Sequence, residues 1–121
     1  MRMLDANIIL RYLLNDNEKM ADEAEKIIRE ERAWVTTEVL AEVVYVLKGV
    51  YGVGCREIKT SILSFLSEVE TTEREIIKLG LEIYAEKSLD FVDCLLYAYN
   101  QVKGYEIMTF DKKLNNLLRK V

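Results

Sequence analysis

The chain has 121 residues, half of them hydrophobic, and we expect a single domain over residues 1–121. Its net charge of −4 argues against passive binding of nucleic acid through a basic surface, and the lack of histidine excludes Ser-His-Asp triads, Cys-His pairs and two-histidine ribonuclease chemistry. No apolar run is long enough to cross a membrane, and Asp5 precedes any apolar stretch that a signal peptide would need, so we expect a cytoplasmic protein.

The first half of the chain alternates short apolar runs with segments of helical hydrophobic spacing. These patterns predict a strand at 1–4, a helix at 7–14, a turn at 15–17, an amphipathic helix at 18–31 and a strand at 33–35. A further helix contains Glu42. Thr36 or Thr37 is its expected N-cap, and it ends between Gly49 and Gly54.

The second half is predicted to contain more helix. We expect helices at 57–69, 72–87 and 90–103, a strand at 105–110 and a last helix from 111, with 69–71 left open between strand and loop. Thr72 and Asp90 are the expected N-caps, and Gly104 ends the helix before the last strand. Short apolar strands separated by helices predict a three-layer α/β/α sandwich with a short central parallel sheet.

Two aspartates follow predicted strands. Asp5 comes after the first strand and Asp111 after the last, and ligands of such folds bind beyond the carboxyl ends of the strands. Alternatively, each aspartate is simply the N-cap of the helix that follows it. The two interpretations stay open for both residues.

Two further acids lie within predicted helices. Glu42 stands alone in the apolar run 39–47, so we expect its carboxylate to be desolvated; the alternative is that it reaches solvent or pairs with a distant lysine. Asp90 and Asp93 are three residues apart at a helix start, and we assign the cap to Asp90 and a ligand role to Asp93.

Together these acids point to a metal site. Carboxylates that cluster repel one another and titrate upward unless a cation lies between them. With oxygen ligands alone, the expected ion is Mg²⁺, with Mn²⁺ as an alternative, and the number of ions is open. Asp5, Glu42, Asp93 and Asp111 are therefore the candidate metal ligands and catalytic residues.

Four segments in succession also resemble the motifs of PIN-domain proteins, particularly VapC-type toxins. They are residues 4–14 (LDANIILRYLL), 39–47 (VLAEVVYVL), 89–98 (LDFVDCLLYA) and 108–114 (MTFDKKL), in the order of the family. One departure is Ala6, where many family members carry Thr or Ser.

The resemblance implies roles for named residues. The four acids named above correspond to the metal-binding acids of the family, Asn7 and Thr109 are polar neighbours that orient water or ligands, and Asp90 adds charge beside the site. It further implies a magnesium-dependent endoribonuclease that hydrolyses RNA phosphodiesters by metal-activated water. Such a protein is the toxin of a type II toxin–antitoxin pair, a homodimer that a cognate antitoxin inhibits.

The sequence also offers candidates for contact with RNA. Arg11, Lys48 and Lys112 are expected to guide the RNA backbone, although each is equally well explained as a surface charge. Tyr12 and Tyr45 can stack on bases, but core packing is the expected role of both. The rival hypothesis from another class is a non-catalytic PIN-like scaffold that binds RNA or a protein.

Overall fold

The computed structural model describes residues 2–30 and 32–119 of the chain. Contacts within the chain divide it into two compact units, Met1–Thr72 and Glu73–Val121. We call them the first unit and the second unit and treat each by itself. The expectation of one domain over residues 1–121 stays a prediction.

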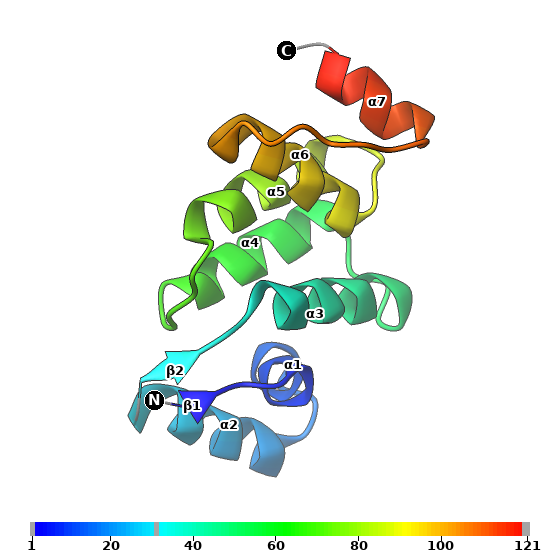
Figure 1. Cartoon of the computed structure of the whole chain (residues 1–121). Coiled ribbons are helices and arrows are strands. Elements are labelled where there is room, and N and C mark those ends of the chain that lie inside the picture. Colours follow the sequence, from blue (N-terminus) through cyan, green and yellow to red (C-terminus); the bar gives the residue numbers. More distant parts are fainter. Residues whose placement is uncertain (1, 31, 120–121) are drawn as a thin grey trace. The chain divides into compact units, whose positions relative to one another are not determined.

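The first unit holds a short parallel sheet. Strand β1 (Arg2–Met3) pairs with β2 (Ala33–Trp34), with Met3 opposite Trp34, and the two lie side by side in Figure 1. The sequence does not decide between strand and loop for residues 69–71, and in the structure Glu70 forms an isolated parallel bridge with Trp34. The predicted α/β class with a short parallel sheet is therefore confirmed, although the strands are shorter than expected.

Four helices complete the first unit: α1 (Ala6–Leu14), α2 (Glu18–Glu30), α3 (Thr37–Gly49) and α4 (Cys55–Leu66). Helix α1 packs against α2 and α3, and α3 packs against α4. The Thr36 hydroxyl accepts a hydrogen bond from the Val39 N–H at 3.2 Å, so Thr36 is the N-cap of α3. Fully buried side chains of this unit include Ile9, Val35, Leu40, Val43, Ile58, Ile62 and Phe65.

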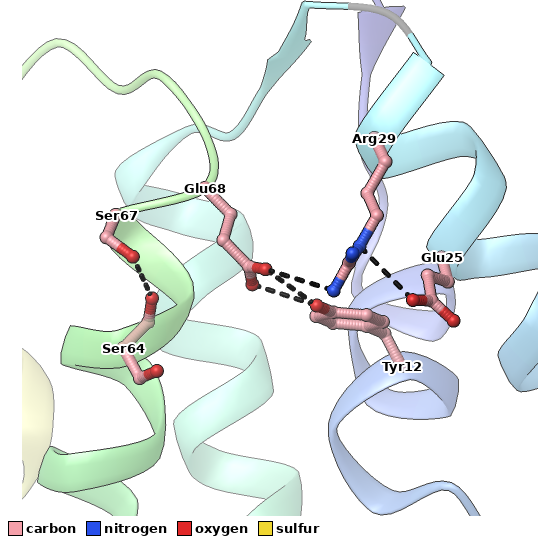
Figure 2. Close-up of polar contacts among 6 residues, drawn as sticks. All are labelled: Tyr12, Glu25, Arg29, Ser64, Ser67 and Glu68. Carbon is pink, nitrogen blue, oxygen red and sulfur yellow. Dashed lines mark hydrogen bonds and ion pairs between the residues drawn. The ribbon is translucent and has the colours of Figure 1, made fainter.

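A polar network joins three elements of the first unit (Figure 2). The Tyr12 hydroxyl donates to the Glu68 carboxylate, with 2.9 Å to each oxygen. Arg29 forms ion pairs with both glutamates, with 4.0 Å from its Nη2 to Glu68 Oε1 and 3.2 Å from its Nε to Glu25 Oε1. Burial and the hydrogen bond to Glu68 raise the pKa of Tyr12. Its ring packs at 6.1 Å from Phe65, which confirms the expected packing role of Tyr12.

The secondary structure of the second unit, over its described residues, consists of helices: α5 (Arg74–Glu86), α6 (Phe91–Lys103) and α7 (Lys112–Arg119). Helices α5 and α6 run side by side and α7 packs on α6 (Figure 1). The close approach depends on Gly80, because a Cβ there would come within 3.0 Å of Leu95 Cδ2. Gly104 ends α6 with a φ of 72°, as its position predicted.

One predicted strand is wrong. Residues 105–110 form no strand in the structure. A strand exists only when its backbone pairs with a neighbour, and here local side chains hold the two ends instead: Asn100 donates to the Tyr105 carbonyl at 2.8 Å, and Asn115 to the Thr109 carbonyl at 2.9 Å. The apolar side chains Met108 and Phe110 are exposed rather than packed in a sheet.

The N-cap of α5 differs from the predicted one. Thr72 is not the N-cap of α5, because the helix begins later and Glu73 takes that position without a side-chain cap bond.

Across residues 2–30 and 32–119, none of the helices combines the length and apolar character that a bilayer-spanning segment needs.

Candidate functional site

Asp5 lies at the N-terminus of α1 in the first unit. It is the N-cap, with φ of −92° and ψ of 172°, and its Oδ1 accepts a hydrogen bond from the Ile8 N–H at 3.1 Å. Within the described part of the chain Oδ2 has no hydrogen-bond partner, and the side chain is exposed. Asp5 therefore acts as an N-cap, which uses only one of its two carboxylate oxygens, and its role as a metal ligand stays a prediction.

Asp111 has the same arrangement at the N-terminus of α7. Its Oδ1 accepts from the Leu114 N–H at 2.8 Å, and its own N–H donates to the Thr109 hydroxyl at 3.0 Å. The Asn115 amide, donating to the Thr109 carbonyl, holds the turn from the other side. The predicted polar neighbour Thr109 thus contacts Asp111 directly, and Oδ2 of Asp111 stays without a partner among the described residues.

Asp90 and Asp93 lie at the start of α6. Asp90 occupies the N-cap position, as predicted, but its side chain makes no cap hydrogen bond. Asp93 is in the first turn, and burial raises its pKa, followed by the negative charges of Asp111 and Asp90. Asp93 is therefore close enough to Asp111 and Asp90 for its charge to be repelled by theirs.

Glu42 lies on α3, whose buried face is formed by Leu40, Val43, Val44 and Leu47. The expectation that its carboxylate is desolvated is wrong, because Glu42 is exposed. It lies three residues from Tyr45, which is 76% exposed, so α3 presents a mixed stripe opposite its core face. The same exposure shows that the expected packing role of Tyr45 is wrong. Asn7 is likewise exposed, on α1.

Within residues 2–30 and 32–119, no group of three or more acidic or cysteine side chains stands ready to hold a metal ion. The aspartates of the second unit interact through their charges without forming a finished ligand set. Their chemistry nevertheless fits a hard divalent cation, since the donors are carboxylate oxygens and a cation would relieve the repulsion at Asp93. The convergence of all four acids on one ion stays a prediction.

Comparison with family models matches the chain to the PIN domain over residues 2–120. The chain belongs to the PIN-domain family. Proteins of this family are generally nucleases that use divalent metals and bind nucleic acid. Comparison with curated proteins and with solved structures gives no match. The resemblance to the VapC subgroup stays a prediction.

The basic candidates of this PIN domain differ in their surroundings. Arg11 is held inside the first unit, donating to Asp16 and to the Tyr51 hydroxyl at 3.0 Å each, and these contacts raise its pKa. Its guanidinium therefore ties α1 to the turn after α3. Lys48 and Lys112 are exposed, and Lys112 opens α7 directly after Asp111. Contact of the three side chains with RNA stays a prediction.

Sequence reasoning missed two side chains of the PIN domain near Asp111. Asn115 fixes the Thr109–Asp111 turn, and Lys113 donates from Nζ to the Ser88 carbonyl at 3.4 Å. Asn115 carried no sequence signal, because an amide in a helix usually faces solvent. Lys113 had one, since it is the second of two lysines that follow Asp111.

Proposed function

We propose that this PIN domain is a metal-dependent endoribonuclease, the toxin of a type II toxin–antitoxin pair that acts in the cytoplasm. The observation that carries the proposal is the group of aspartates in the second unit. Asp90, Asp93 and Asp111 form no ion pair with a described residue, and the pKa of Asp93 is raised by its burial and then by the charges of Asp111 and Asp90. In a family of metal-dependent nucleases, carboxylates without a cationic partner can serve as metal ligands.

The proposed ligands are Asp5 and Asp93 for the principal ion, with Glu42 and Asp111 completing the acidic set. A bound Mg²⁺ or Mn²⁺ would polarise the phosphodiester and make water a better nucleophile.

The chain itself contributes orientation. At Asp5 and at Asp111 one carboxylate oxygen is fixed by a helix N-cap, which holds the second oxygen in a defined direction. Thr109 steadies Asp111 through the backbone, and we propose that Asn7 orients water or substrate beside Asp5. Asp90 adds negative charge next to Asp93 and so strengthens the attraction for a cation.

The partners of the proposal are RNA, a second copy of the chain and a cognate antitoxin that covers the acids. The support is the order and spacing of the four sequence motifs within a chain that the family model covers over residues 2–120. A non-catalytic PIN scaffold is the second candidate. It is favoured by one observation, that no ready ligand set of three acids exists within the described residues.

The test of catalysis uses purified protein and a panel of RNAs with Mg²⁺, Mn²⁺ or EDTA. We expect cleavage with either ion and none in EDTA, with 3′-hydroxyl and 5′-phosphate ends because no ribose 2′-oxygen attacks. Asp5→Asn is the matched control, since asparagine keeps the N-cap and removes the charge. Cleavage in EDTA, or 2′,3′-cyclic phosphate ends, would contradict the mechanism, and RNA binding without cleavage would favour the scaffold.

The test of the toxin role is expression in cells. We expect wild-type protein to arrest growth and Asp5→Asn to have no effect at equal protein level. Co-expression of a cognate antitoxin, sought as a short reading frame adjacent to the gene, should restore growth. Arrest by the Asp5→Asn variant would show that the effect does not depend on the proposed chemistry.

A further inference from the structure

A small cavity in the second unit has a different character from the aspartates beside it. It measures about 220 Å³ and is lined by Lys87, Ser88, Leu89, Lys113, Asn116 and Leu117. None of these lining residues is acidic, in a chain whose net charge is −4. We propose that this cavity binds a backbone phosphate of the RNA strand, next to the phosphodiester that is cleaved; the second half of this statement rests on the proposed function.

The donors of the cavity are arranged around Lys113. Its Nζ donates one hydrogen bond across the cavity wall to the Ser88 carbonyl at 3.4 Å, which leaves two N–H groups for a ligand. Lys87 and Lys113 form no ion pair with a described carboxylate, so their charges are not compensated inside the unit. The Asn116 amide and the Ser88 hydroxyl add neutral donors.

The cavity lies on the segments that carry the aspartates. Lys87–Leu89 run directly into Asp90, the N-cap of α6, and Lys113 follows Asp111 by two residues at the start of α7. Because α6 and α7 pack on each other, the lysines and the aspartates share one end of this helix pair. A polyanion that approaches the aspartates is repelled by them, and two uncompensated lysines beside them offset that repulsion.

The size and chemistry of the cavity favour phosphate over other ligands. Pockets for drug-sized molecules measure about 300–1,000 Å³, so this cavity suits a small group rather than a whole cofactor. Lysine binds phosphate as a point charge, and two lysines with neutral donors and no acidic residue line this cavity.

The experiment measures binding of a labelled single-stranded RNA oligonucleotide in EDTA, where cleavage does not interfere. Lys87→Gln and Lys113→Gln should each weaken binding several-fold and lower the slope of log affinity against log salt by about 0.7, the value for one lost phosphate contact on a single strand. The matched control is Lys78→Gln, which removes an exposed lysine of α5 that does not line the cavity. It should bind with the affinity and slope of the wild type.

Further arms make each outcome decisive. Lys113→Arg should keep the salt slope, because the charge that meets the phosphate is retained, and circular dichroism melting checks that each variant is folded. Inorganic phosphate should compete with RNA for the wild type more strongly than for the Lys87→Gln, Lys113→Gln double variant. Equal affinity and slope for the cavity variants and Lys78→Gln, or failure of the wild type to bind RNA, would overturn the proposal.

Failure of the nuclease proposal has a separate readout. If the protein binds RNA through the cavity lysines but leaves it intact in Mg²⁺ and Mn²⁺, the phosphate site stands and the catalytic assignment falls. If it cleaves RNA and the lysine variants cleave at the wild-type KM and kcat, the catalytic assignment stands and the phosphate site falls.

Discussion

Glu68 and Glu70 of the first unit and the three aspartates of the second unit have opposite surroundings. In the first unit, Glu68 accepts the Tyr12 hydroxyl, and Glu70 lies 2.6 Å from Arg32. In the second unit, burial and then the charges of Asp111 and Asp90 raise the pKa of Asp93, and no described cation pairs with these three aspartates. Partnered carboxylates hold elements together, whereas partnerless carboxylates gathered in one place cost stability and indicate a binding function.

The comparison is tested most strongly by activity. Asp93→Asn should lower the rate of RNA cleavage about a thousandfold or more, because losing several kcal/mol of transition-state stabilisation corresponds to about three powers of ten. Glu68→Gln removes one carboxylate from the first unit and should leave the specific activity of folded protein unchanged. Rates measured at saturating Mg²⁺ on the same RNA compare the two variants. Equal losses from both would erase the distinction between the units.

The N-caps sharpen the comparison, since Asp111 serves both structure and the proposed site. Asp111→Ala removes the bond to the Leu114 N–H and should lower the free energy of unfolding by about 1 kcal/mol. Asp111→Asn keeps a cap and should unfold like the wild type in urea while losing cleavage. If alanine and asparagine cost the same stability, Asp111 does not act as a cap in solution.

The network of the first unit predicts a loss of stability without a loss of chemistry. Tyr12→Phe removes the hydroxyl that Glu68 accepts and should lower the free energy of unfolding by about 0.5–1.5 kcal/mol. Tyr45→Phe is the matched control, because that ring is 76% exposed and its hydroxyl has no hydrogen-bond partner among the described residues. Urea unfolding measures the stability of both variants. Equal midpoints would show that the hydrogen bond of Tyr12 contributes nothing to the free energy of unfolding.

Much of the fold could be predicted from local patterns. The bounds of α2 and α6 follow from hydrophobic spacing, and Thr36 and Gly104 mark helix ends by their chemistry. The strand predicted at 105–110 shows where such reasoning fails. Its apolar residues fit a strand, but pairing depends on distant backbone, and side-chain bonds from Asn100 and Asn115 take the ends instead.

The candidate residues of the site could be predicted from the sequence, but their burial and hydrogen-bond partners could not. The positions of Asp5 and Asp111 after predicted strands suggested either caps or ligands, and the hydrogen bonds show that capping leaves one oxygen of each free for a second role. Glu42 was misjudged, because an apolar run suggests burial on all sides while α3 buries only one. The contact of Lys113 with the Ser88 carbonyl could not be predicted, because Ser88 lies in the loop before α6, far from Lys113 in the sequence.

The smallest expected effect concerns the cost in stability of burying the Asp93 carboxylate beside two other acids. Its pKa is raised in the folded state, so the folded protein holds that proton more tightly than the unfolded chain does. The stability linked to Asp93 is complete below the ordinary carboxyl pKa of about 4 and is lost as pH rises through the raised pKa. Without metal at neutral pH, Asp93→Asn should therefore melt slightly higher than the wild type, with the difference closing as pH falls below about 4.

The matched control for this effect is Asp22→Asn, which changes an exposed acid of α2 and should give no pH-dependent difference. Adding Mg²⁺ should raise the melting temperature of the wild type and leave Asp93→Asn unchanged, because an ion that binds only the folded state stabilises it by mass action. The order of the two melting temperatures then reverses. A wild type that melts above Asp93→Asn in EDTA at neutral pH would show that burial and the neighbouring charges of Asp111 and Asp90 do not destabilise the Asp93 carboxylate, and the contrast with the partnered carboxylates of the first unit would disappear.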